Sequence, residues 1–163
     1  MFVGGQNAEN FRNRKGYFSI NVQTVSDAQL RIRNVVGRWP GATNDRLIFN
    51  NSRIKAQLNG GVFGNSLILG DSGYTLDNHV MIPLANPVTR AENLYNESHI
   101  RTRNVVERQY GIWKRRFQIL RLEIRVLMPT ILAIIVATPV LHNIAINDPE
   151  PLDNNFFKDE ENI

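Results

Sequence analysis

The chain has 163 residues, 42% of them hydrophobic, which predicts one domain with a core of ordinary size. It contains no cysteine, which excludes disulfide bonds and thiolate zinc sites and favours an intracellular protein. The net charge of +4 is unevenly distributed, because residues 148–163 carry −5 and residues 1–147 carry +9. We therefore expect one basic domain over residues 1–147 and an acidic, disordered tail over residues 148–163. A basic domain attracts polyanions, although composition alone equally suits a solvated helix face beside an acidic end.

The first half of the chain favours a β-hairpin. Residues 17–25 alternate between apolar and polar side chains, as in a half-buried strand whose even-numbered residues face the core. Residues 30–36 are expected to pair back as an antiparallel strand, in a register that places Arg31 and Arg33 toward solvent or a phosphate backbone. Residues 37–41 then predict a loop.

A short helix and a buried strand are expected next. Thr43 or Asn44 can cap a helix over residues 45–49. The apolar run 67–69 ends at Gly70, so Asp71 is expected at the C-terminal end of a buried strand. Residues 81–84 suit a further short strand.

The next segment predicts a long basic helix that carries Glu107. Five apolar residues recur at steps of three and four and form one stripe: Val106, Tyr110, Trp113, Phe117 and Leu120. Glu107 lies at the edge of this stripe and can face a cleft. It can equally pair with Arg103 one turn earlier, which is the commoner role of a glutamate on a basic helix.

Residues 126–141 are uncharged over 16 positions, which is shorter than the roughly 20 apolar residues that cross a bilayer. Pro129 and Pro139 interrupt this run, so we expect a buried helix that begins near Pro129 and is kinked or ended by Pro139. The expected protein has no membrane partner. A membrane-associated protein built around this segment is the alternative.

A strand-end Asp71 and a helical Glu107 suggest a metal site. Carboxylate oxygens suit Mg²⁺ or Mn²⁺, and the two cations of a phosphodiester-cleaving site need shared carboxylates. The sequence offers no obvious third acid for such a site.

Five blocks of sequence occur in one order and closely resemble the Harbinger-type DDE transposases and the nucleases derived from them. The blocks are Asn13 to Gln23, Arg38 to Asp45, Leu69 to Tyr74, Arg101 to Arg108 and Val140 to Asn143. The resemblance implies an α/β, RNase H-like mixed sheet flanked by helices. It also implies an enzyme that cuts DNA in the nucleus, with the cytoplasm as a further location.

The same resemblance implies the site. Asp71 and Glu107 match catalytic acids of the family, and Asp45 matches a further acidic, metal-associated position. The implied cofactor is a divalent cation, Mg²⁺ or Mn²⁺. In a two-metal mechanism one cation activates the attacking water and the other stabilises the departing 3′ oxygen.

DNA is the implied substrate, and a separate Myb-like DNA-binding protein is the implied partner. Five cations are nominated as contacts to the DNA backbone: Arg103, Arg108, Lys114, Arg115 and Arg116. Each of them would also suit a solvated helix face.

The family carries its first catalytic Asp on a strand before the Asn13 block, and no aspartate precedes Asn13 here. We therefore expect an N-terminally incomplete domain without its first strand, with weak or no catalysis. A catalytically inactive remnant that binds DNA or protein is the alternative function.

Overall fold

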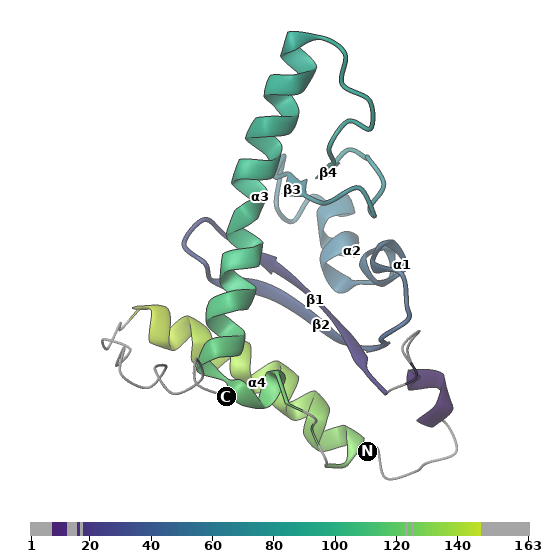
Figure 1. The fold of residues 1–163 in the computed structure, drawn as a ribbon, viewed down its shortest axis with the longest axis vertical. Coiled ribbons are helices and arrows are strands. Elements are labelled where there is room, and N and C mark those ends of the chain that lie inside the picture. The colour runs from purple at the N-terminus through teal and green to yellow at the C-terminus, as the bar shows by residue number, and fades with distance from the viewer. Residues whose placement is uncertain (1–7, 13–15, 17, 123, 125, 148–163) are drawn as a thin grey trace, which may run out of the picture.

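The computed structural model describes residues 8–12, 16, 18–122, 124 and 126–147. The predicted tail over residues 148–163 lies outside these residues, so the predicted domain boundary stays a prediction. The described part is a mixed α/β structure with two small sheets (Figure 1). The long helix α3 runs the length of the molecule beside both of them (Figure 1).

The predicted hairpin is confirmed as strands β1 (Ile20–Ser26) and β2 (Ile32–Pro40), which pair antiparallel. The Asp27 carboxylate shapes the turn, because it accepts the backbone N–H groups of Gln29 and Arg31 at 3.0 Å each. Leu30 takes the left-handed conformation there, with φ of 66°. The 3₁₀ turn η1 (Ala8–Phe11) precedes the hairpin.

The predicted loop over residues 37–41 is wrong in large part, because β2 continues to Pro40. Trp39 and Pro40 pair with Asn21 and Ile20, and a bulge between Asn21 and Gln23 absorbs the change of register. The prediction that the polar residues of this strand face away from the core is also wrong for Gln23, which is only 8% exposed. Both faces of the hairpin are covered, which alternation alone could not show.

The second unit contains two short helices and a small parallel ladder. Helix α1 (Asp45–Asn50) is capped by Asn44, whose side chain accepts the N–H of Arg46, as predicted. Helix α2 (Arg53–Asn59) follows, and β3 (Ile68–Leu69) pairs parallel with β4 (Val80–Met81). The predicted strand over residues 81–84 is thus shifted toward the N-terminus. A core cluster joins these elements: Phe49, Ile54, Leu58 and Val80.

The predicted long helix is confirmed as α3 (Arg90–Arg116), which begins with a capping box between Thr89 and Glu92. It ends before Phe117 and Leu120, so the last two residues of the predicted apolar stripe are not part of the helix. Its side chains contact both the hairpin and the second unit. Tyr95 and His99 reach the carbonyl oxygens of Ile82 and Met81, whereas Trp113, at 2% exposure, is buried near the hairpin end. The short 3₁₀ turn η2 (Gln118–Leu120) follows.

Helix α4 (Met128–Asn147) packs on β2 with one face. Pro139 lies inside the helix and does not end it, so that part of the prediction is wrong. Gly37 makes the close approach of α4 possible, because a Cβ there would lie 2.4 Å from a methyl group of Ile135. Among the described helices, α4 is the one whose length and apolar composition would suit a bilayer. Only 28% of its apolar stretch is buried, so the predicted buried helix is buried on one face alone.

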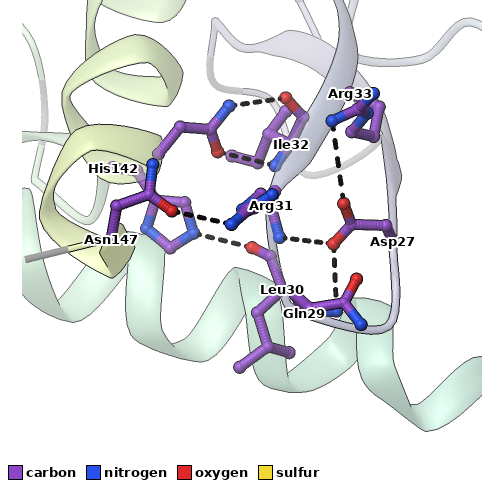
Figure 2. A network of polar contacts seen from close by, with 9 residues as sticks. Asp27, Gln29, Leu30, Arg31, Ile32, Arg33, His142 and Asn147 are labelled. Carbon is purple, nitrogen blue, oxygen red and sulfur yellow. Dashed lines mark hydrogen bonds and ion pairs between the residues drawn. The ribbon is translucent and has the colours of Figure 1, made fainter.

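The C-terminal end of α4 holds the turn of the hairpin through side chains (Figure 2). His142, which is fully buried, donates from Nε2 to the carbonyl oxygen of Leu30 at 3.0 Å. Asn143 accepts the N–H of Ile32 at 2.8 Å and donates to its carbonyl at 2.9 Å, as a neighbouring strand would. Asn147 accepts from Arg31 Nη2 at 2.8 Å.

This contact corrects the predicted direction of Arg31. Its guanidinium group bonds to Asn147 on α4 through an exposed hydrogen bond and Arg31 is half-buried, whereas the side chain of Arg33 is 62% exposed, as predicted. The pairing of hairpin and helix across 116 positions of sequence is a tertiary contact that strand alternation does not encode.

Burial of His142 makes the fold sensitive to acid. Desolvation, with a smaller contribution from Arg116, lowers the pKa of His142 below its ordinary value. The unfolded chain therefore binds this proton at higher pH than the folded chain. The stabilisation is complete above an ordinary histidine pKa of about 6.5 and is lost as the pH falls below it.

We expect the Tm to fall between about pH 7.5 and pH 5.5, and to fall less for His142→Gln. His79→Gln serves as the control variant. Equal losses of Tm in the wild type and in His142→Gln would contradict the assignment of the acid sensitivity to His142.

Candidate functional site

A cleft of about 380 Å³ lies between β1, α1, the end of β3 and the middle of α3. Its lining includes Asp45 and Asp71, together with Arg103, Tyr74 and Tyr110. Asp45 and Asp71, separated by 26 positions of sequence, thus reach one cavity, which Asp27 of the hairpin turn also lines.

Asp45 is the first residue of α1 and is fixed by the neighbouring strand. Asn21 donates from its amide to Asp45 Oδ1 at 2.8 Å and to the carbonyl of Thr43 at 3.0 Å. Gln23 donates to the backbone carbonyl of Asp45 at 3.0 Å and to the hydroxyl of Tyr74 at 2.8 Å. The polar residues of β1 therefore hold the carboxylate in place, because their amides bond the acid and its backbone.

Asp71 directly follows β3 and Gly70, as predicted. Its Oδ1 accepts the N–H of Gly73 at 2.8 Å, which closes a tight turn. A Cβ at position 70 would lie 3.0 Å from the ring of Tyr74, so glycine lets that ring pack against the backbone. The Tyr74 ring also meets Phe49 edge to face at 5.9 Å between centroids. The Gly-Asp-Ser-Gly-Tyr block thus forms one compact turn that presents Asp71.

The two tyrosines report the negative potential of the cleft. Burial raises the pKa of the Tyr74 hydroxyl, and the carboxylates of Asp45 and Asp71 raise it further. Burial also raises the pKa of Tyr110, with a further contribution from Asp45. Both carboxylates therefore act on the same phenol.

Glu107 does not share the environment of Asp45 and Asp71. Its side chain is 61% exposed, and its Oε1 accepts from Arg103 Nη2 at 2.8 Å. Glu107 is not among the residues that line the cleft, although Arg103, Val106 and Tyr110 on the same helix are. The structure thus contains the helical ion pair that the sequence allowed as an alternative. Within the described ranges, no three His, Asp or Glu side chains are grouped so that they could hold a metal ion.

The five nominated cations divide into two kinds. Arg108, Lys114 and Arg115 are exposed on α3, and the ammonium group of Lys114 lies 5.5 Å from the ring centroid of Tyr110. Arg103 pairs with Glu107, and Arg116 approaches His142 Nδ1 at 3.4 Å and its carbonyl at 3.5 Å. Arg116 therefore has a structural contact that the helix pattern did not reveal.

Asn21, Gln23 and Tyr74 are parts of the site that sequence reasoning did not single out. Two of them belong to a strand whose polar face was expected to meet solvent. The available signal was the density of amide side chains on that face, since Asn and Gln can both donate and accept. Tyr74 stands in the same block as Asp71, at the position that a turn brings back over Gly70.

The comparison with protein families identifies the family of the chain. Residues 4–143 match the model of the DDE superfamily endonucleases, and the chain belongs to that family. The predicted family resemblance is thereby confirmed.

The curated relatives carry one name, "Putative nuclease HARBI1". The human and bovine proteins are each 34% identical over 120 residues, which is 72% of this chain and 34% of theirs. The mouse protein is 34% identical over 150 residues, or 89% of this chain and 43% of its own length. The chain thus spans between a third and a half of these relatives. No solved structure shows a significant match.

Proposed function

We propose that the cleft is the metal-dependent site of a DNA endonuclease domain with an RNase H-like fold. The observation that carries this proposal is the convergence of Asp45 and Asp71, from α1 and from the end of β3, on one cavity. Family membership and the nuclease name of the relatives support the reaction class. DNA is the proposed substrate and the nucleus the proposed location, with a Myb-like DNA-binding protein as partner.

The donor set fits a hard cation. Asp45 and Asp71 offer carboxylate oxygens to one cavity, which supports a site for a hard cation. Mg²⁺ or Mn²⁺ bound there would supply an activated water and would stabilise the departing 3′ oxygen. The role of the chain itself is to hold the two carboxylates through Asn21 and through the turn at Gly73.

Glu107 is the proposed third acid, and reaching the cleft requires it to leave Arg103. An exposed helical pair of this kind stabilises by only about 0.3–0.5 kcal/mol, which is small beside the affinity of a carboxylate for a divalent cation. Release of Glu107 would also free Arg103, which already lines the cleft, for a phosphate oxygen. The pair therefore does not oppose the proposed site.

A nicking assay tests the proposal. The purified chain is incubated with supercoiled plasmid and Mn²⁺, Mg²⁺ or EDTA. We expect weak formation of open-circle product with Mn²⁺, in keeping with the weak catalysis expected from the sequence, and none with EDTA. Absence of nicking with either cation, from protein shown to be folded by circular dichroism, would contradict it.

The exposed cations of α3 predict DNA binding that is separable from metal. Lys114→Glu should weaken binding to duplex DNA by about tenfold at low salt and reduce the salt slope by about 1, because one or more phosphate contacts are lost. The measurement is fluorescence anisotropy in EDTA across a salt series. Arg90→Glu is the matched control, since this exposed residue begins α3 at about 36 Å from position 114. An equal loss in both variants would show that only net charge matters.

A further inference from the structure

Three arginines lie on one line along α3, and we call them the arginine stripe. Arg101, Arg108 and Arg115 follow one another at steps of seven residues. Seven residues are two helical turns to within about 20°, and they advance about 10.5 Å along the axis. All three side chains are exposed. Arg101 pairs with Glu97 at 2.7 Å, whereas Arg108 has no ion pair within the described ranges.

The arginine stripe lies on a different side of α3 from the cleft. A helix turns by about 100° per residue, so Arg103 and Lys114 lie roughly 100° to 160° around the axis from the stripe. Arg103 lines the cleft, and Lys114 lines a second cavity together with Tyr110, which also lines the cleft. α3 therefore has two separate basic sides, and one of them meets the proposed metal site.

α4 ends nearer the arginine stripe than Lys114. α4 crosses the C-terminal end of α3 (Figure 1). Its Ile135 shares the second cavity with Lys114, whereas its His142 contacts Arg116 at 3.4 Å and 3.5 Å. Arg116 lies roughly 60° to 100° from the stripe and about 160° from Lys114 around the helix axis. Asn147, the last residue of α4, thus follows the part of the helix that has passed to the side of the stripe.

The chain continues from Asn147 with its acidic segment, residues 148–163. This segment lies outside the described residues, and its sequence has six acids and one lysine. Its 16 residues can span at most about 53–58 Å, which is several times the distance of about 10.5 Å between successive arginines of the stripe. Attachment beside the stripe also gives the acids an effective concentration of about a millimolar or more.

We propose that residues 148–163 bind the arginine stripe of their own chain. Guanidinium groups hold carboxylates through paired N–H donors, and the stripe repeats such a group every two turns. The segment carries −5 and residues 1–147 carry +9, so the contact neutralises charge on both sides. The cleft is a poor alternative position for the segment, because Asp45 and Asp71 line it and repel further acids.

This contact has a consequence for DNA, which rests on the proposed nuclease function. An uncovered stripe attracts duplex DNA to a side of α3 that faces away from the carboxylates of the cleft. With the stripe covered, the cations left to DNA include Arg103 and Lys114, on the side where the cleft lies. The acidic segment thereby directs DNA toward the proposed site.

Carbodiimide cross-linking of the full chain tests the contact without metal or DNA. The reagent joins a carboxylate to an amine that it touches, and Arg108→Lys places an amine in the stripe while keeping the charge. We expect at least about tenfold more cross-linking of residues 148–163 to position 108 than to Lys114, because tethering concentrates the acids on the stripe. Lys55 and Asp77, which already form an ion pair, are the internal positive control. The product at position 108 should be lost at about 1 M salt, where the Debye length is only about 3 Å.

Duplex DNA binding, measured by fluorescence anisotropy in EDTA, tests the consequence. In one background the six acids of residues 148–163 are replaced by their amides, and in the other they are kept. We expect Arg108→Glu to weaken binding by about tenfold without the acids and by less than about twofold with them, since the stripe is then already occupied. Lys114→Glu is the matched control and should cost the same in both backgrounds. The change in net charge is common to both substitutions, so a difference between them reports the contact.

Three results would overturn the proposal. The first is cross-linking at position 108 no greater than at Lys114, in protein whose Lys55 and Asp77 do react. The second is a link found only between isotope-labelled and unlabelled chains in a mixture, which would assign the stripe to a second copy. The third is an equal loss of DNA affinity for Arg108→Glu in both backgrounds, which would make the stripe a DNA surface. If the chain binds no DNA at all, the proposed function fails, and cross-linking alone decides on the contact.

Discussion

Replacing Asp71 by asparagine will lower the rate of Mn²⁺-dependent nicking by roughly 100-fold or more, because a metal-ligating charge is lost from the cleft. Asparagine keeps the oxygen that accepts the N–H of Gly73, so the turn should remain. The nicked fraction of supercoiled plasmid over time gives the rate, and circular dichroism checks the fold. Activity within about threefold of the wild type would remove Asp71 from the proposed site.

The chain offers a matched control at Asp77. Its Oδ1 accepts the N–H of His79 at 2.8 Å in the same kind of turn that Asp71 makes with Gly73. Asp77 pairs with Lys55 and is not among the residues that line the cleft. Asp77→Asn thus removes the same charge from a similar turn outside the site. We expect its nicking rate to stay within about twofold of the wild type.

The sequence predicted those parts of the fold that depend on neighbouring residues. The cap at Asn44, the hairpin of residues 17–25 and 30–36 and the presentation of Asp71 after an apolar run are confirmed, because each depends on residues close together in the sequence. The length of β2 was missed, because a bulge near Asn21 lets residues after Val36 keep pairing. The extra residue of the bulge lies in β2 itself, between Val36 and Trp39, where it interrupts the alternation that predicts a strand.

The candidate site was predicted in its acids but not in its supports. Asp45 and Asp71 do reach one cleft, and their assignment as metal ligands stays a prediction. The side chains that hold them come from β1, 24 positions before Asp45 in the case of Asn21, and such contacts are tertiary. For Glu107, helical spacing allowed either a position facing a cleft or the commoner ion pair with Arg103, and the structure contains the ion pair.

The second large effect concerns stability and the clamp between α4 and the hairpin. Asn143→Leu removes both hydrogen bonds to Ile32, and leucine has a similar shape but no polar atoms. Ile32 is 6% exposed, so its N–H and C=O lose partners that water cannot easily replace. We expect the free energy of unfolding to fall by about 3 kcal/mol. Urea unfolding followed by circular dichroism measures it, provided that the m-value is unchanged.

Asn147→Leu is the control for this clamp, one turn later on the same helix. Asn147 is exposed, and its bond reaches a guanidinium group of Arg31, not a backbone group. Water can hydrate the guanidinium group of Arg31, but it cannot easily reach the backbone of Ile32 against α4. We therefore expect Asn147→Leu to lower the free energy of unfolding by less than about 1 kcal/mol. If both variants lost the same free energy, the loss would reflect the general solvation of the helix end. A loss confined to Asn143 would instead show that one amide side chain acts as a missing strand for the hairpin.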